Sequence, residues 1–216
     1  MDFAAARKNM VASQIKTNRV TDPLVVEAMS AVPRENFLPA AQREFAYVDK
    51  DLSIGNGRTI MEPMVLARML QLADVQTSDS ALVIGAGEGY CAAVLAHMAR
   101  SVIALDCDAE LVARASKTLA EMKTQNVTVV TGDLKLGKPN QGPFDVILIN
   151  GAVDFIPDAL KQQLADGGRL VCVVREGPLG RATLVERTGN AFGHRQDFDC
   201  SPAILPGFAK QAGFVF

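Results

Sequence analysis

The sequence predicts an α/β fold in which helices cover both faces of a twisted, mostly parallel sheet. From residue 81 onward, short apolar runs alternate with helical stretches, as in sheets that are buried on both faces. The last strand-like runs have no long helix between them, which predicts antiparallel strands at the C-terminal end. With 216 residues, 49% of them hydrophobic, the chain can bury one large core without disulfides or a metal. We therefore expect a single domain over residues 1–216.

The sequence of residues 1–75 predicts a helical cap. This cap precedes the sheet region, which covers residues 76–216. Apolar side chains on one face predict a helix over residues 3–17, and an Asp-Pro start predicts a second helix that ends near Met29. Gly-Asn-Gly at residues 55–57 predicts a turn, and a further helix is expected from Pro63 to about Leu72.

The sheet region predicts five parallel strands and a closing antiparallel pair. The apolar runs that predict the parallel strands cover residues 81–84, 102–105, 127–130, 146–149 and 170–174. Helices are expected between them over residues 90–99, 109–123 and 157–164. Residues 182–187 and 193–198 alternate apolar and polar side chains and predict the antiparallel pair.

Charge and hydropathy give no indication of a nucleic-acid or membrane partner. The net charge is -2 and the isoelectric point about 5.7, so the chain lacks the basic surface that binds phosphate backbones or anionic lipid. The N-terminus lacks the basic start and apolar run of a signal peptide, and glycines interrupt the most apolar stretch, residues 81–99. We expect a cytoplasmic protein. The sequence gives no indication of its oligomeric state.

The cysteines and histidines do not predict a metal site. His97 and His194 are the two histidines, and neither is spaced as a ligand partner of the other or of a cysteine. No Cys-x-x-Cys pair is present, so we expect buried, free thiols in a reducing compartment. The cysteines are Cys91, Cys107, Cys172 and Cys200.

A glycine-rich loop carries the sharpest signal for a ligand. Residues 85–89 read Gly-Ala-Gly-Glu-Gly between the first apolar run and a predicted helix. Glycine lets the backbone turn tightly and approach a ligand, and the new helix offers unpaired N–H groups. Tyr90 stands where the dinucleotide fingerprint requires its third glycine, which favours S-adenosylmethionine over NAD. A ligand-free glycine turn is the alternative. The predicted cofactor contacts here are Gly85, Ala86, Gly87, Gly89 and Tyr90.

Polar side chains also follow the next three strands, at the edge where open α/β sheets bind ligands. Asp106, followed by Cys107, ends the second strand and is placed to accept the hydroxyls of a ribose. Asp133, followed by Leu134, ends the third strand and is placed to accept a hydrogen bond from an adenine amino group. Asn150 ends the fourth strand and is expected to face the same crevice. The alternatives are a strand-end acid or helix cap at Asp106 and an Asx-turn at Asp133.

The order of motifs resembles the protein-L-isoaspartate O-methyltransferase family over nearly the whole chain. The segments that carry the resemblance are residues 7–11, 32–39 and 156–170, together with the glycine loop. The resemblance implies a Rossmann-like class I methyltransferase that methylates isoaspartyl carboxylates in damaged proteins or peptides. It also implies S-adenosyl-L-methionine as cofactor and S-adenosyl-L-homocysteine as product.

The sequence departs from this family on the acceptor side. Family members typically read Thr-Ile-Ser followed by a variable residue and proline, whereas residues 59–63 read Thr-Ile-Met-Glu-Pro. The candidate acceptor-side residues are therefore Thr59, Met61 and Glu62. Met61 has no hydroxyl, and like charges a few ångströms apart cost about 1 kcal/mol or more, so Glu62 opposes an acidic substrate unless it turns away. The alternatives are an apolar contact ahead of the helix for Met61 and a solvated acid at the helix N-terminus for Glu62.

Three functions follow from these observations. The first is isoaspartyl methylation, for which the acceptor carboxylate needs positioning rather than a strong base. The second is a divergent member of the fold that binds S-adenosylmethionine but methylates another acceptor or is not catalytic. The third is an NAD-dependent oxidoreductase, against which the glycine spacing and the lack of an acid–base set for hydride transfer both count.

Overall fold

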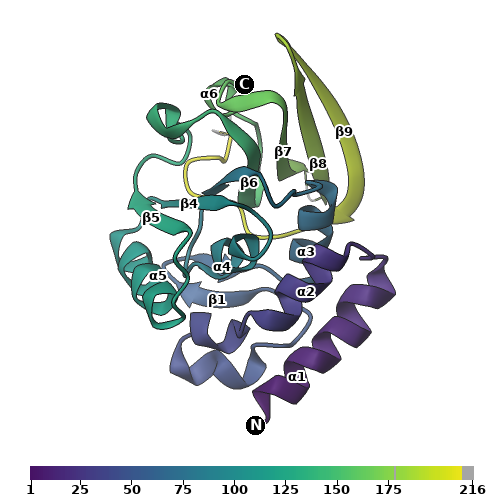
Figure 1. Ribbon diagram of the computed structural model, residues 1–216, viewed down its shortest axis with the longest axis vertical. Helices are drawn as coiled ribbons and strands as arrows, with labels where there is room; N and C mark the ends of the chain where they lie inside the picture. The colour runs from purple at the N-terminus through teal and green to yellow at the C-terminus, as the bar shows by residue number, and fades with distance from the viewer. Residues whose placement is uncertain (178, 211–216) are drawn as a thin grey trace, which may run out of the picture.

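A seven-stranded sheet in the order β5-β4-β3-β6-β7-β8-β9 forms the centre of the computed structural model (Figure 1). β3 to β7 run parallel, and β8 pairs antiparallel with both β7 and β9. The strands are β3 (Ser80–Ile84), β4 (Ser101–Asp106), β5 (Val127–Thr131), β6 (Phe144–Val153), β7 (Leu164–Glu176), β8 (Leu179–Thr188) and β9 (Ala191–Cys200). The fold predicted from the sequence is confirmed, including the antiparallel C-terminal pair.

The structure describes residues 1–177 and 179–210. The last six residues of the expected sheet region, 211–216, lie outside this description. No helix among the described residues is long and apolar enough to cross a membrane.

The order in which the chain connects the strands reverses between β3 and β6. The candidate site lies at this position in the sheet. Val83 in β3 pairs with Ala104 of β4 on one side and with Leu148 of β6 on the other. From β3 the chain moves outward to β4 and β5, then returns to β6 on the opposite side of β3. The carboxyl ends of β3 and β6 therefore border a crevice, because their connections lead away in opposite directions.

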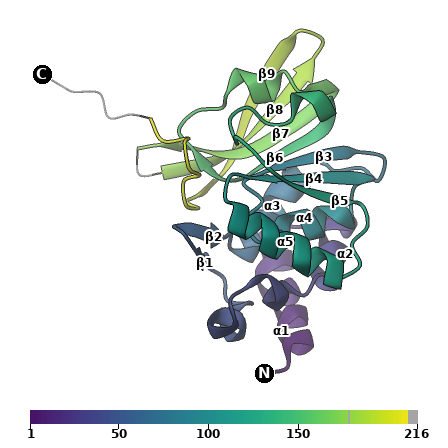
Figure 2. The same cartoon turned by 90° about the vertical axis from the view of Figure 1, so that its left-hand side faces the viewer.

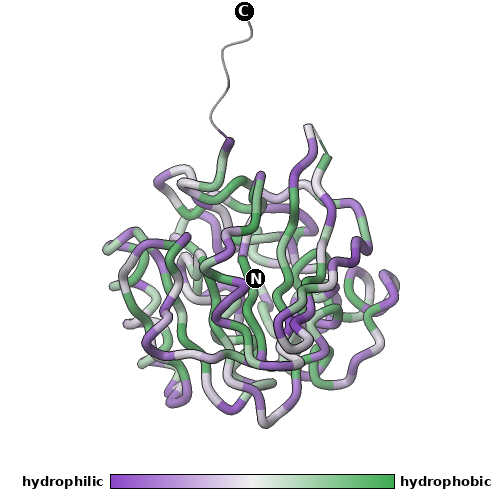
Figure 3. Tube along the Cα trace, turned by 90° about the horizontal axis from the view of Figure 1, so that it is seen from above, coloured by the Kyte–Doolittle hydropathy of each residue, from purple (hydrophilic) through white to green (hydrophobic). Residues whose placement is uncertain are grey.

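Helices cover the two faces of the sheet unequally. α3 (Pro63–Leu72), α4 (Tyr90–Ala96) and α5 (Ala109–Glu121) lie together on one face, as Figure 2 shows. The other face is covered by the four-residue α6 (Asp158–Lys161) and by residues 201–208, which contribute buried side chains to a second core cluster. Hydrophobic stretches follow the inner strands and hydrophilic ones the outer turns (Figure 3).

The N-terminal cap packs against the α3 and α4 side of the sheet. α1 (Phe3–Met10) continues as a π-helical turn (Val11–Ile15) and a 3₁₀ turn (Lys16–Asn18), so the single helix predicted for residues 3–17 is helical but changes geometry after its eighth residue. α2 (Pro23–Ala31) begins at a side-chain cap from Asp22. Two 3₁₀ helices (Arg34–Phe37 and Ala40–Phe45) follow.

The structure corrects three expectations. The helix predicted over residues 157–164 is limited to α6, because β7 already begins at Leu164. The turn predicted at residues 55–57 connects an antiparallel hairpin, β1 (Leu52–Gly55) and β2 (Arg58–Ile60), whose strands were not predicted. All four cysteines are free, but Cys107 is exposed and Cys200 only partly buried, whereas all were expected to be buried.

A charged contact ties the start of β3 to β7. The Arg169 guanidinium donates to the main-chain carbonyl of Ala73 at 3.0 Å and to Asp79 Oδ2 at 2.8 Å, while the Asp79 carbonyl accepts from Arg100 N. Because both side chains are largely buried, losing the guanidinium removes the charged partner of Asp79, whose Oδ2 keeps only the bond from Gln76 N, and the side-chain donor to the Ala73 carbonyl.

We predict that Arg169→Ala lowers the free energy of unfolding by about 2 kcal/mol in urea denaturation, as expected for hydrogen bonds to a charged group. Lys117→Ala, which removes an exposed ion pair with Glu121 inside α5, is the control and should change it by less than about 0.5 kcal/mol. Equal effects of the two substitutions would contradict this account of the β3–β7 contact.

Candidate cofactor site

The glycine loop follows β3 directly and turns over the end of β4. Gly85 and Gly87 have φ of +76° and +57°, in the left-handed region that favours glycine. The N–H groups of Gly85 and Ala86 both donate to the carbonyl of Leu105, at 2.9 and 3.0 Å. The sequence therefore places the backbone of this loop against the neighbouring strand, where no side chain intervenes.

The carboxylate of Asp106 organises this end of the sheet. It is fully buried and accepts main-chain hydrogen bonds from Gly87 N at 2.7 Å and from Asp108 N at 3.1 Å. Arg58 adds a two-pronged ion pair, with Nη1 2.8 Å from Oδ1 and Nη2 3.0 Å from Oδ2. Both oxygens expected to accept a ribose are thus engaged by the protein itself.

The carbonyl of Gly85 is the second acceptor in the crevice. It accepts from Asn150 Nδ2 at 3.0 Å and from Arg58 Nη2 at 3.2 Å. Asn150 therefore joins the end of β6 to the glycine loop, at the point where the sheet reverses its order. The glycine loop, Asp106 and Asn150 thus lie together at this edge of the sheet.

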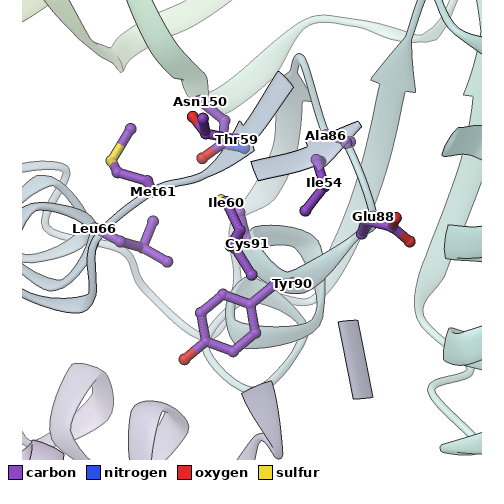
Figure 4. A pocket seen from close by; sticks show the side chains of 11 residues that line it. Ile54, Thr59, Ile60, Met61, Leu66, Ala86, Glu88, Tyr90, Cys91 and Asn150 are labelled. Carbon is purple, nitrogen blue, oxygen red and sulfur yellow. The ribbon is translucent and has the colours of Figure 1, made fainter. Parts of the chain in front are cut away.

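A small cavity of about 10 Å³ lies beside the loop (Figure 4), roughly the space of one water molecule. Six of the predicted site residues line it together with residues that were not predicted. The lining comprises Ile54, Thr59, Ile60, Met61, Leu66, Ala86, Gly87, Glu88, Tyr90, Cys91 and Asn150. The structure thus brings the acceptor-side residues Thr59 and Met61 next to the glycine loop.

Seven predicted site residues lie outside this lining, and three of them, Gly85, Gly89 and Asp106, belong to the glycine loop and the end of β4. Cys107 is exposed, and Leu134 is buried in the core cluster on the α6 face. Asp133 is exposed and its Oδ1 accepts from Lys135 N at 2.7 Å, which is the Asx-turn alternative. Glu62 is the residue before α3, and its side chain makes no capping hydrogen bond to that helix.

The acceptor side carries more negative charge than the sequence motif alone indicates. Glu62 is half-buried, and its main-chain N–H donates to Asp51 Oδ1 at 2.8 Å. Burial, and then the nearby carboxylates of Asp49 and Asp51, raise the pKa of Glu62 above its ordinary value. Met61 is buried, and its carbonyl accepts from Arg34 Nη2 at 2.7 Å.

Glu88, the charged residue of the glycine loop, has a partner within the chain. Its carboxylate lies 3.1 Å from Arg114 Nε, and Arg114 also donates to the carbonyl of Ile54. Figure 4 shows the Glu88 side chain turned away from Met61 and Leu66. Burial raises its pKa, and Arg114 opposes that shift. The geometry favours a structural ion pair that connects α5 to the glycine loop, while the bond to Ile54 connects α5 to the hairpin.

Sequence reasoning missed the two side chains that fill the crevice, Arg58 and Leu205. The side chains of Arg58 and Ile60 are both buried on one side of β2. A buried arginine requires an anionic partner, so this pattern could have indicated Asp106 as the partner of Arg58. Leu205 gave no such signal. Its terminal methyls lie 2.8 Å from where a Cβ on Gly85 would be, so the glycine is required for this close approach.

The fold and the arrangement of these residues identify the protein as a class I methyltransferase. The donor set suits S-adenosylmethionine, since a glycine loop, a strand-end acid and an amide meet at the sheet reversal. Arg58 and Leu205 fill the crevice between these groups. A solved protein-L-isoaspartate O-methyltransferase aligns with a TM-score of 0.84 at 23% identity, over 93% of this chain and 66% of that one.

Comparisons with known proteins agree on the family. Residues 5–199 match the model of the family described as Protein-L-isoaspartate(D-aspartate) O-methyltransferase (PCMT). The chain is 42% identical to Protein-L-isoaspartate O-methyltransferase 2 of Anaeromyxobacter sp. (strain Fw109-5), over 93% of this chain and 82% of that protein. It is 38% identical to Protein-L-isoaspartate O-methyltransferase of Koribacter versatilis, over 95% and 92%.

A second solved structure has a TM-score of 0.80 at 22% identity, over 95% of this chain and 98% of that one. It is a Plasmodium falciparum protein described as a putative protein-L-isoaspartate O-methyltransferase in complex with S-adenosyl-L-homocysteine. The chain belongs to the protein-L-isoaspartate(D-aspartate) O-methyltransferase family, a family of S-adenosylmethionine-dependent O-methyltransferases. The resemblance seen in the sequence is confirmed, and the family favours methyl transfer over the NAD-dependent alternative.

We predict that Arg58 and Asp106 are energetically coupled. Arg58→Met leaves a buried carboxylate with two main-chain donors, and Asp106→Asn leaves a buried guanidinium without its counter-charge, so each should destabilise the protein. In urea denaturation the double variant should lose less free energy of unfolding than the sum of the single variants, by about 1–3 kcal/mol. Simple additivity would show that the pair is not a coupled unit.

Proposed function

We propose that this protein transfers a methyl group from S-adenosylmethionine to the carboxylate of isoaspartyl residues in proteins or peptides. The observation that carries the proposal is the family match over residues 5–199, supported by relatives of that name at about 40% identity. The convergence of Asp106, Asn150 and the glycine loop supports the cofactor part of the proposal.

Five of the predicted cofactor-site residues have a role in this proposal. Gly85 and Gly87 admit the cofactor close to the backbone, and Asp106 accepts the ribose hydroxyls. Asp133, at the end of β5, binds the adenine amino group through its carboxylate. Asn150 keeps the loop in register with β6 through its bond to the Gly85 carbonyl.

The reaction requires the protein mainly to position the two reactants and to exclude water from them. When bound, S-adenosylmethionine supplies a methyl group on a positively charged sulfur. An acceptor carboxylate oxygen forms the new bond to this carbon as the carbon–sulfur bond breaks, and no proton has to move. Thr59 offers the acceptor a hydroxyl donor at the cavity, while Ile54, Met61 and Leu66 exclude water from it.

The charges near Glu62 favour a second candidate within the same class. Glu62, Asp49 and Asp51 repel an anionic acceptor, so a methyltransferase that acts on an uncharged acceptor fits this surface as well. The identity of the acceptor therefore distinguishes the two candidates. The expectation of a cytoplasmic location, which the four free cysteines suit, remains a prediction.

A labelled-methyl assay tests the proposed function. The protein is incubated with S-adenosylmethionine and either an isoaspartyl peptide or the same peptide with a normal aspartate. We expect label to enter the isoaspartyl peptide alone, as a base-labile ester. No incorporation into that peptide, together with binding of S-adenosylhomocysteine, would favour the alternative acceptor.

Substitution of Glu62 tests the charge argument. Because the pKa of Glu62 is raised, its charge appears at a higher pH than that of an ordinary glutamate and is lost as the pH falls. Glu62→Gln should lower the KM for the isoaspartyl peptide at neutral pH by roughly threefold to tenfold, with little change in kcat. This advantage should shrink as the pH falls through the pKa of Glu62.

The same substitution should stabilise the fold at neutral pH. A carboxyl with a raised pKa contributes stability below its unfolded pKa and loses it as the pH rises through the folded value, so removing the charge relieves the loss.

Glu121→Gln, an exposed position on α5, is the control and should leave KM unchanged. A KM for Glu62→Gln that stays equal to that of the unaltered protein would refute the repulsion.

A further inference from the structure

The candidate crevice is filled from one side by Arg58. Its guanidinium lies between the Asp106 carboxylate and the Gly85 carbonyl, bonded to both, and the residue is only 4% exposed. S-adenosylmethionine carries positive charges on its sulfur and its amino group. A bound guanidinium therefore opposes the cofactor in two ways, because it takes the acceptors and adds a like charge.

Residues 201–208 fill the crevice from the other side. After β9 the chain turns back toward the end of β6, and in Figure 2 this segment and the β1–β2 hairpin approach the sheet from the same edge. Ala152 N donates to Ala203 O, and Leu205 N donates to Ala152 O, both at 2.9 Å. The Leu205 methyls lie 2.8 Å from where a Cβ on Gly85 would be, and one of its side-chain atoms lies 2.7 Å from the corresponding point on Gly151.

This segment is held by fewer contacts than the strands beside it. One parallel bridge, between Ala152 and Ile204, and the bond from Asp154 N to Phe208 O join it to the end of β6, whereas β7 and β8 pair along eight residues. Phe208 anchors its far end in the core. A segment with few main-chain bonds opens more readily than the sheet, so it can lift without unfolding β6 or β7.

We propose that Arg58 and Leu205 form an internal plug that competes with the cofactor. The cofactor enters when Arg58 releases Asp106 and residues 201–208 lift from β6. The ligand's identity rests on the proposed function, whereas the plug itself rests on the contacts above. Because only the open state binds, the apparent affinity is reduced by the fraction of molecules that are open.

Calorimetric titration with S-adenosylhomocysteine tests the plug. Arg58→Met removes the cation but keeps much of the side-chain volume, and Leu205→Ala shortens the apolar contact without touching the charges. Each should lower Kd by about tenfold relative to the unaltered protein if the plug is closed in most molecules. Two variants are used so that the test survives if either one folds poorly.

Two matched controls remove similar groups far from the crevice. Arg169→Ala breaks a partly buried ion pair, and Leu164→Ala removes a fully buried leucine from the same core cluster as Leu205. Both should leave Kd unchanged among the molecules that circular dichroism shows to be folded. This separates plug release from general loosening of the structure.

Hydrogen exchange provides a readout that does not depend on affinity. The Leu205 amide is bonded to Ala152 O, so its exchange should become faster when S-adenosylhomocysteine binds, whereas the Val171 amide in β7 should not change. Slower exchange at Leu205, or an unaltered protein that binds as tightly as both variants, would overturn the plug alone. If neither the unaltered protein nor a variant binds the ligand, the cofactor part of the proposed function fails with it.

Discussion

The buried carboxylate of Asp106 joins the three parts of the chain that make the candidate site. It ends β4, accepts from Gly87 in the glycine loop and pairs with Arg58 on the β1–β2 hairpin. A buried charge is tolerated only when it is paired and hydrogen-bonded, so the loop and the hairpin are both held by the same electrostatic requirement. Thr59 and Met61 lie beside the cavity because Arg58 fixes the strand that carries them.

This arrangement explains how a methyl-transfer site can be formed with few catalytic groups. The polar groups of the crevice include main-chain N–H and C=O groups, the carboxylate of Asp106, the amide of Asn150 and the guanidinium of Arg58, while Ile54, Met61 and Leu66 supply apolar walls. Such a site orients its ligands and keeps water away, which is what a carboxylate nucleophile requires. In the proposed function, the preference for one acceptor over another depends on Glu62 and the nearby acids Asp49 and Asp51.

Much of the fold and part of the site could be predicted from the sequence, because their signals are local. The glycine spacing and the acids at strand ends follow directly from the alternation of strands and helices, and parallel strands bring them together. Arg58 and Leu205 were missed because their roles come from contacts across 48 and 120 positions of sequence, respectively, with Asp106 and Gly85. The inward alternation of Arg58 with Ile60 is a weak local signal because β2 has only three residues, and Leu205 gives no such signal.

A crystal structure of the unaltered protein with S-adenosylhomocysteine tests the central claim most directly. The account predicts that the ribose lies on Asp106, that Arg58 has left this carboxylate, and that Leu205 no longer covers Gly85. A complex in which the ligand is bound while Arg58 still pairs with Asp106 and Leu205 still contacts Gly85 would contradict it.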